Sequence, residues 1–404
     1  MHPPVPTKLG LPLWAFICGT TLSFTGAFIQ KIAVGWLVWE ETHATFWVAA
    51  VALADLLPTL FMSIPAGAIV DRFHPAKTFW VSQIAAALQA VALCALAATG
   101  HLNIGVLIAC VIFLGACFAF SWPSRVAYLM QLTPPGSYQR VVALNSIAGN
   151  VAFFVGPMIG GEILSRFGAT TAFAANAAAY APMIIVAALL PRTNQSQVKQ
   201  AVHRGALQSI REGFVFALRH HEILTLLLSF AAAAVTARGI MELAPSIAAT
   251  ALDGDVKMLS YLASSIALGA LIGGLWMSRG HGIGGRRMII WTLSGAALAL
   301  LGYGAAGQRE IALAGGAFLG FALAINNISV TSALQLYTPA DYRGRINSLY
   351  NMIFRGGPAI GALAFGWLAQ AVDVRVASIL AAIVLVVMTI AIAELAGRGK
   401  TSLM

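Results

Sequence analysis

Twelve long apolar runs, separated by short polar connections, constrain this chain more than any other feature of its sequence. A helix that spans the hydrocarbon core of a bilayer needs about 20 apolar residues. Only 9% of the 404 residues are charged, whereas a soluble domain carries roughly 25%. The sequence therefore predicts an all-α membrane protein with twelve transmembrane helices, near 12–38, 46–70, 77–99, 102–125, 143–165, 169–190, 223–249, 257–278, 287–306, 310–335, 346–371 and 375–395.

A polar segment, 191–222, divides these runs into two sets of six. Within it, apolar residues recur at helical spacing from Leu207 to Leu218, which predicts an amphipathic helix on the membrane surface. We therefore expect an N-terminal six-helix bundle at 1–190, a cytoplasmic linker at 191–222 and a C-terminal six-helix bundle at 223–404.

Lysine and arginine residues gather on one side of the predicted membrane. With the N-terminus inside, sixteen of the 24 lie in cytoplasmic segments, four lie outside and four fall within the runs. Cytoplasmic loops carry this excess in membrane proteins, so both termini are expected in the cytoplasm. The net charge of +10 therefore indicates topology and not nucleic-acid binding. No phosphate-binding loop, catalytic constellation or metal-ligand spacing occurs in the sequence, so we expect no cofactor, no metal and no enzymatic activity.

The two sets of six runs also repeat one another. Asn145-Ser146 followed by Gly156-Pro157 parallels Asn347-Ser348 followed by Gly357-Pro358, at an offset of about 201 residues. Two halves in the same orientation are parallel repeats, and transporters place the substrate site at the interface of such repeats.

The connection after the second run carries the motif that points to a family. Gly67, Asp71, Arg72 and Lys77 match the Gly-x-x-x-Asp-Arg signature of the major facilitator superfamily, while residues 74–76 depart from it. The resemblance implies two pseudo-symmetric six-helix bundles, the major facilitator fold. It also implies that this motif helps to gate the transport cycle.

The fifth run carries a second signature. Gly149, Gly156, Pro157, Gly160 and Gly161 resemble the superfamily's antiporter motif, which is typical of exporters. Glycines at four-residue spacing leave a flat helix face, and proline bends the helix. We expect this face at an interface that rocks during transport; a generic packing helix is the alternative.

Three further segments narrow the resemblance. The stretches Glu212–His220, Trp122–Arg125 and Tyr342–Leu349 are similar to the bacterial branch that includes enterobactin-type siderophore exporters and macrolide efflux proteins. The resemblance implies a secondary active transporter, an antiporter of the cell inner membrane that exports a small amphiphilic molecule in exchange for protons. We expect a monomer that contacts membrane lipid and binds no nucleic acid.

Charged residues inside the runs are the best functional candidates, because a charge in the membrane is costly unless it is paired or hydrated. Lys31 and Asp55 are predicted to pair between adjacent helices, and Arg238 and Glu242 share a helix face. Protonating a carboxylate would free its partner and shift the conformational equilibrium, so all four are candidates for proton coupling. Static ion pairs that fix helix packing are the alternative. Arg355 is a candidate for binding an anionic substrate.

Polar and aromatic residues in the pore-forming runs complete the expected substrate cavity: Gln30, Trp36, Asn150, Tyr261, Asn326, Asn327, Gln335 and Arg355. Two other functions stay open from the sequence. A lysophospholipid translocase would have an apolar cavity open sideways to the bilayer, with basic residues at headgroup depth. A membrane sensor or scaffold would transport nothing.

Overall fold

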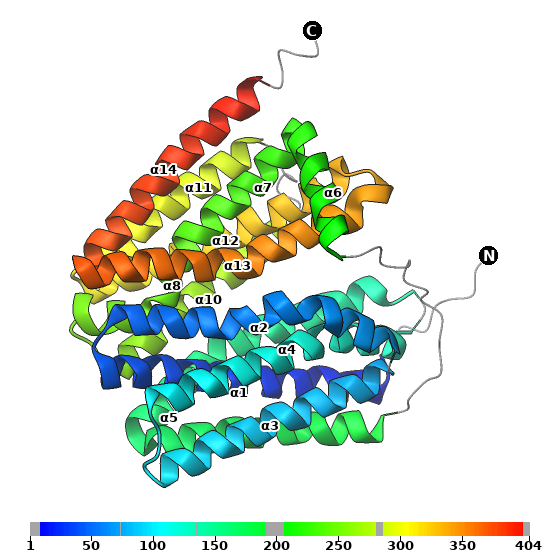
Figure 1. The fold of residues 1–404 in the computed structure, drawn as a ribbon, viewed down its shortest axis with the longest axis vertical. Coiled ribbons are helices and arrows are strands. Elements are labelled where there is room, and N and C mark those ends of the chain that lie inside the picture. Colours follow the sequence, from blue (N-terminus) through cyan, green and yellow to red (C-terminus); the bar gives the residue numbers. More distant parts are fainter. Residues whose placement is uncertain (1–8, 73, 135, 191–205, 280–285, 399–404) are drawn as a thin grey trace. The chain divides into compact units, whose positions relative to one another are not determined.

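The computed structural model describes residues 9–72, 74–134, 136–190, 206–279 and 286–398. Within these ranges the chain forms helices joined by short connections and contains no strand (Figure 1). Ten of the described helices are long and apolar enough to cross a membrane. The structure thus confirms an all-α membrane protein, whereas the number twelve stays a prediction.

The first half of the chain forms five long helices. They are α1 (Leu11–Thr42), α2 (Thr45–Arg72), α3 (Pro75–Ala98), α4 (Ile104–Leu132) and α5 (Tyr138–Leu189). With 52 residues, α5 would measure about 78 Å if it were straight, more than twice the thickness of the hydrocarbon core. Gly168 interrupts it with φ 77° and ψ 178°, a conformation essentially restricted to glycine. The two arms on either side of Gly168 correspond to the predicted runs 143–165 and 169–190.

Local sequence signals explain where several helices begin. Asn103 accepts a hydrogen bond from the Val106 N–H at 3.0 Å at the start of α4. Pro75 occupies the first turn of α3, where its missing N–H has no intrahelical partner to lose. Such caps satisfy backbone donors that a helix N-terminus leaves free.

The second half contains more elements because three of its helices include π-helical turns. The elements are α6 (Ala206–Arg219), α7 (His221–Ala233), η1 (Ala234–Arg238), α8 (Gly239–Glu242), α9 (Ala244–Ser246), η2 (Ile247–Ala251), α10 (Val256–Ser278), α11 (Arg286–Leu300), η3 (Leu301–Ala305), α12 (Arg309–Tyr337), η4 (Ala340–Tyr342), α13 (Arg343–Ala371) and α14 (Val374–Arg398). The predicted run 223–249 is therefore not one regular helix. Its π-helical turns η1 and η2 are of the kind that proteins often place at functional sites.

The chain divides into two compact units. One contains residues Met1–Glu41 and Leu57–Gln200, and the other contains Thr42–Leu56 and Ala201–Met404. The first half of α2 thus packs with the second unit, where the Thr45 and Ser246 hydroxyl oxygens lie 2.6 Å apart. The division at residue 200 falls inside the predicted linker 191–222, of which residues 191–205 lie outside the described part of the chain.

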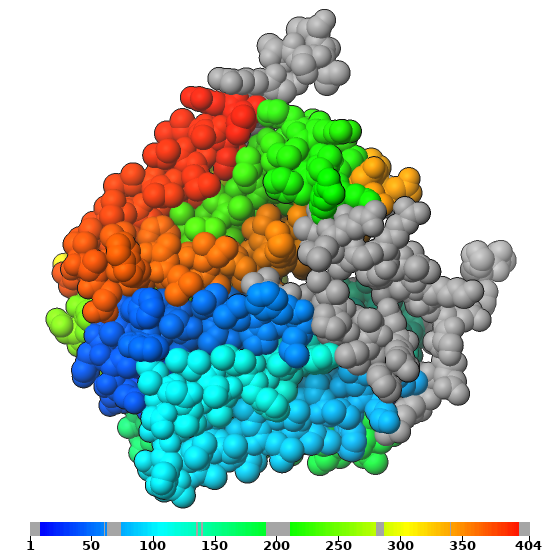
Figure 2. All heavy atoms as spheres, viewed as in Figure 1, coloured from blue at the N-terminus to red at the C-terminus, as the bar shows by residue number. Residues whose placement is uncertain are grey.

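Apolar side chains cover the outside of the helices as they do in lipid-facing proteins. The helix α14 is red in Figure 2, and most of its valine and isoleucine side chains are exposed. Val387 is 59% exposed and Ile390 is 55% exposed. A soluble protein rarely exposes a large contiguous apolar patch, so this surface fits a membrane-spanning helix.

Candidate functional site

A cation held by aromatic rings lies within the second unit. The Arg238 guanidinium, on the π-helical turn η1, stands 4.2 Å from the centroid of the Phe354 ring of α13. Phe230 of α7 stacks on Tyr350 at 4.5 Å and on Phe354 at 6.1 Å. Aromatic faces attract a cation through the ring quadrupole, and more strongly where water is excluded. The rings thus stabilise an arginine charge that lipid would not.

Polar groups connect this cation to three more elements. Arg238 interacts electrostatically with Glu242 of α8 and with Tyr350 of α13. The Tyr350 hydroxyl donates a short hydrogen bond to Asn327 Oδ1 of α12. Glu242 also acts on Tyr303 of η3. We call Arg238, Glu242, Tyr350, Phe354 and Asn327 the arginine cluster.

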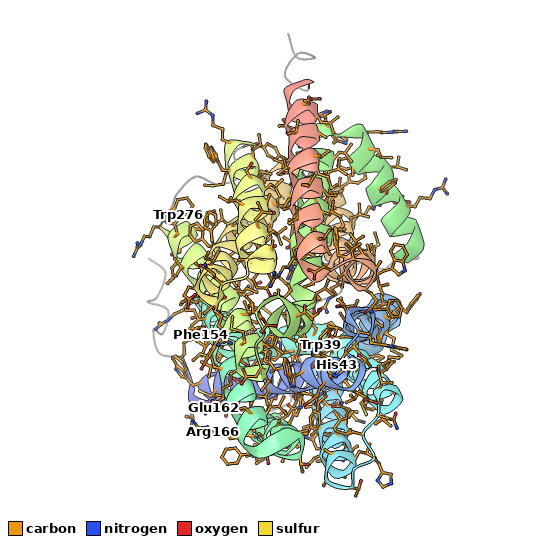
Figure 3. The ribbon with its side chains drawn as sticks, turned by 90° about the vertical axis from the view of Figure 1, so that its left-hand side faces the viewer. Trp39, His43, Phe154, Glu162, Arg166 and Trp276 are labelled. Atoms are coloured by element: carbon orange, nitrogen blue, oxygen red, sulfur yellow. The ribbon has the colours of Figure 1, made fainter. Side chains whose placement is uncertain are left out.

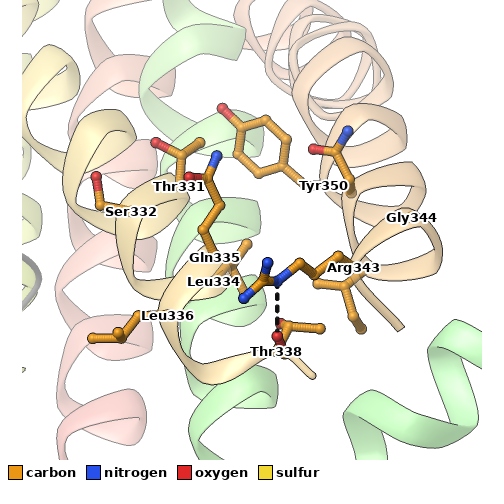
Figure 4. Close-up of a pocket in the computed structure, with 11 residues that line it drawn as sticks. Thr331, Ser332, Leu334, Gln335, Leu336, Thr338, Arg343, Gly344 and Tyr350 are labelled. Carbon is orange, nitrogen blue, oxygen red and sulfur yellow. Dashed lines mark hydrogen bonds between the residues drawn. The ribbon is translucent and has the colours of Figure 1, made fainter. Parts of the chain in front are cut away.

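A cavity of about 710 Å³ adjoins the arginine cluster between α12 and α13. Tyr350 lines this cavity and also belongs to the cluster, so one side chain connects the two (Figure 4). Gln335 and Asn347 contribute polar groups to the lining. At the edge of the cavity, Arg343 Nε donates to the Thr338 carbonyl oxygen at 3.2 Å. The volume lies within the usual range for small-molecule sites, roughly 300–1,000 Å³.

The structure gives Asp55 a charge partner inside the second unit. Asp55 lies in the part of α2 that packs with this unit, and its carboxylate acts electrostatically on Arg355 of α13. Lys31 is exposed on α1, in the first unit. The Lys31–Asp55 pair therefore stays a prediction. Within the second unit, Asp55 interacts with Arg355.

Other predicted cavity residues lie in different surroundings. Gln30 is 1% exposed and accepts a 2.6 Å hydrogen bond from Asn176, while Asn326 is 2% exposed and donates to Thr292 Oγ1 at 3.1 Å. Buried polar groups need such partners, so both bonds fix helix packing. The contribution of these two side chains to a substrate cavity stays a prediction. The same holds for half-buried Trp36 and for exposed Asn150 and Tyr261.

The motif after the second run lies at the end of α2. Gly67, Asp71 and Arg72 belong to this helix, but their side chains lie outside the described part of the chain. Lys77 is exposed on α3. The gating role of the motif stays a prediction.

The glycines of the fifth run have a definite neighbour within the first unit. A Cβ added at Gly156 would lie 2.6 Å from Phe28 Cβ, and one added at Gly160 would lie 3.0 Å from Ile29 Cα. Both glycines therefore let α5 approach α1 closely, whereas Gly149 has no neighbour within 4 Å of an added Cβ. Packing inside the unit, the alternative considered from the sequence, accounts for these two positions. Pro157 and Gly161 are buried in the same arm.

Two sequence segments that carry the branch resemblance contact each other. Glu212 of α6 pairs with Arg345 of α13 at 3.0 Å, and Phe216 stacks on Tyr342 with 3.9 Å between centroids. A Cβ at Gly213 would lie 3.1 Å from the Arg345 carbonyl oxygen. The amphipathic helix expected on the membrane surface therefore packs one face on the start of α13, beside the cavity.

Replacing Gly213 with valine is expected to loosen the packing of α6 on α13, because an added Cβ would already lie 3.1 Å from the Arg345 carbonyl oxygen and the two further methyl groups need additional room. Trypsin should then cleave after the exposed Arg211 and Arg219 at least about tenfold faster, since cleavage within a helix requires local opening. Glu212→Gln is the matched comparison. Its ion pair is partly exposed, with 34% and 27% exposed side chains, and is worth at most about 1 kcal/mol. We expect a cleavage rate within about fivefold of wild type; a wild-type rate for Gly213→Val would contradict the docking.

A charged pair on α5 lies at the surface of the first unit. Glu162 and Arg166, labelled in Figure 3, pair one turn apart on α5 with 41% and 64% exposed side chains. Among the described residues, no group of three or more His, Cys, Asp or Glu side chains could hold a metal ion.

Sequence reasoning named Arg238, Glu242 and Asn327 but missed Tyr350 and Phe354. These two rings lie four residues apart in one apolar run, and that spacing alone does not separate a binding face from packing. Their position opposite a charged residue in another helix is visible only in the fold.

Comparison with solved structures agrees with this architecture. The fold is similar to that of a variant of the nucleoside transporter NupG, with a TM-score of 0.75, 15% identity and coverage of 95% of this chain and 99% of that chain. It is also similar to a bacterial homologue of the lysosomal transporter Spinster, with a TM-score of 0.71, 15% identity and coverage of 96% of both chains. At this identity the likeness shows the fold alone, which is that of the major facilitator transporters.

Sequence comparison finds transport proteins as well. The chain is 30% identical to the staphyloferrin A transporter of Staphylococcus aureus over 41% of this chain and 42% of that protein. It is 29% identical to the multidrug efflux pump Tap of Mycobacterium tuberculosis over 52% of each. The chain thus spans about half the length of these curated relatives. The enterobactin exporter EntS of Escherichia coli O1:K1 is 23% identical over 85% of this chain and 84% of that protein.

The family model described as transmembrane secretion effector matches residues 6–400, nearly the whole chain. Together with the helical fold, this match confirms the resemblance inferred from the sequence motifs. The chain belongs to the transmembrane secretion effector family of major facilitator transporters.

Proposed function

We propose that this protein exports a small amphiphilic molecule, of the siderophore or drug type, in exchange for protons. The observation that carries the proposal is the arginine cluster, in which a cation, a carboxylate and a tyrosine adjoin a cavity of about 710 Å³. Relatives named for siderophore and multidrug transport support the substrate class. The bacterial inner membrane as location, both termini in the cytoplasm, contact with membrane lipid and a monomeric state belong to the same proposal.

Two carboxylates carry the proposed proton coupling. Glu242 neutralises part of the Arg238 charge, and Asp55 does the same for Arg355. An ionised carboxylate can bind a donor group of the substrate, and proton uptake weakens this interaction and displaces the substrate. Proton release restores the negative charge, so proton and substrate occupy the carboxylate in turn, as exchange requires. Such an exchange shifts the balance between conformations by the difference in binding free energy.

The position of the cavity explains how a bound substrate would act on the arginine cluster. Tyr350 interacts electrostatically with Arg238 and also lines the cavity. A molecule in the cavity that displaces the Tyr350 hydroxyl from Asn327 would alter the surroundings of Arg238 directly. Gln335 and Asn347 would supply hydrogen bonds to its polar groups.

The experiment that tests export is an untargeted metabolite comparison, inside and outside the cells, of a deletion strain complemented with wild type or with an empty vector. We expect one or a few amphiphilic compounds to be retained inside the cells without the protein and to appear outside with it. Lysophospholipid redistributed between the bilayer leaflets, with no retained soluble compound, would favour a lipid translocase. No difference in any compound would contradict transport.

A further inference from the structure

A second buried arginine lies in the first unit and has no part in the proposed proton exchange. Arg125 of α4 is 4% exposed. It lies seven residues before the end of α4, about 10 Å along the helix. At that depth an arginine is costly unless its charge and its donors are satisfied.

The described residues of the first unit provide hydrogen-bond acceptors for only some of the N–H groups of this guanidinium. Arg125 Nη1 donates to Asn145 Oδ1 of α5 at 2.9 Å. The Nε–H is buried and has no hydrogen-bond acceptor, and no described residue of this unit places a carboxylate on the arginine. A guanidinium has five N–H donors in a planar fork that matches a carboxylate. Among the described residues, Nη1 thus has an acceptor and the buried Nε has none.

Two aromatic rings complete the surroundings. The Arg125 Cζ atom lies 4.8 Å from the centroid of Phe24 and 4.6 Å from that of Trp122. The two rings are themselves nearly parallel, at 11°, with 6.3 Å between centroids. Trp122 is 47% exposed, so part of the aromatic cover over the buried arginine is accessible. A planar apolar group could stack there while an acidic group reaches Arg125.

We propose that Arg125, Asn145, Phe24 and Trp122 form a binding site for an organic anion with a flat apolar body. The carboxylate or other acidic oxygen pairs with the unused donors of Arg125, and the flat body lies on Trp122. This inference rests on the proposed function and deepens it, because it assigns a negative charge to the exported molecule. It also gives Arg125 a task in the first unit distinct from that of the arginine cluster.

The test is binding of two probes of equal shape to the purified full chain in lipid nanodiscs, measured by titration calorimetry. Naphthalene-2-carboxylate carries the negative charge, and naphthalene-2-carboxamide does not. Wild type should bind the carboxylate at least about tenfold more tightly than the carboxamide. Arg125→Gln should reduce this preference to within about twofold, and Arg125→Lys should retain part of it because the charge remains without the planar fork.

Arg166→Gln is the matched control, because it removes an exposed arginine from the same unit, and it should keep the full preference. Trp122→Ala should lower the binding affinity for both probes by a similar factor, since stacking on the tryptophan ring depends on the flat body of the probe and not on its charge. Thermal unfolding of each variant separates misfolding from loss of the site, and Arg125→Lys supplies the comparison if Arg125→Gln does not fold.

Equal binding of both probes to wild type, or an unchanged preference in Arg125→Gln, would overturn the proposal. Either result would assign Arg125 to helix packing or to a carboxylate of the protein itself. Failure of export would leave the binding result standing, because this measurement needs neither a membrane potential nor a proton gradient. The two proposals can therefore fail separately.

Discussion

Replacing Arg238 with methionine is expected to lower transport of the retained compound by about a hundredfold while the protein still folds. Methionine keeps much of the volume and a favourable sulfur contact with the Phe354 ring, but it removes the charge that Glu242 and Tyr350 face. A hundredfold loss corresponds to about 2.7 kcal/mol, which is reasonable for one charge interaction in a site that excludes water. The transport rate of the purified variant in proteoliposomes is the measurement.

Two comparison variants define what the Arg238 result means. Arg238→Lys keeps a positive charge but loses the planar face over Phe354, so we expect an intermediate loss of about tenfold. Arg287→Met removes an exposed arginine of the same unit and should transport within about twofold of wild type. If Arg238→Met transports at the wild-type rate, the arginine cluster has no part in the cycle.

Gly361→Val is expected to prevent the second unit from packing. A Cβ at Gly361 would overlap the carbonyl oxygen of Val235 on η1, and one at Gly239 would lie 2.7 Å from the Gly361 carbonyl carbon. The two backbones therefore touch, and no side chain can move to make room. Overpacking usually costs about 1–3 kcal/mol, and the backbone clash places this substitution above that range, at about 4 kcal/mol or more. The yield of monodisperse protein after solubilisation should fall at least about tenfold.

Gly274→Val provides the control for this loss of folded protein. It adds the same side chain to a helix of the same unit, α10, but nothing lies within 4 Å of an added Cβ. Its yield and melting temperature should stay close to those of wild type. A Gly361→Val protein as stable as Gly274→Val would mean that α13 and η1 do not pack as closely as the structure has them.

Hydropathy predicted most spanning helices because lipid imposes a composition that every spanning segment must meet. The break within α5 was also foreseeable, since the apolar runs end at 165 and begin again at 169, on either side of Gly168. The packing of residues Thr42–Leu56 with the second unit could not be foreseen from the sequence. An apolar run carries no information on which bundle it joins, because that choice depends on contacts such as Thr45 with Ser246, which lie about 200 residues apart.

In the candidate site, too, contacts between residues close in the sequence could be predicted, whereas contacts between distant segments could not. Spacing placed Arg238 and Glu242 near each other because they share one short segment. It did not indicate the π-helical turn η1 at Arg238 or the rings of α13, which lie where the backbones of Gly239 and Gly361 approach each other closely. Arg125 was visible as a charge inside an apolar run, but only the fold shows that its neighbours are aromatic and that its Nε–H lacks an acceptor.

Proton movement coupled to export of the retained compound is the most direct test of the central claim. Proteoliposomes of the purified protein, loaded with that compound and an internal pH dye, are diluted into compound-free buffer. Exchange predicts that the interior acidifies as the compound leaves, and that Asp55→Asn combined with Glu242→Gln abolishes the acidification. Efflux from wild-type liposomes without any change in internal pH, or unchanged coupling in the double variant, would contradict proton exchange through these carboxylates.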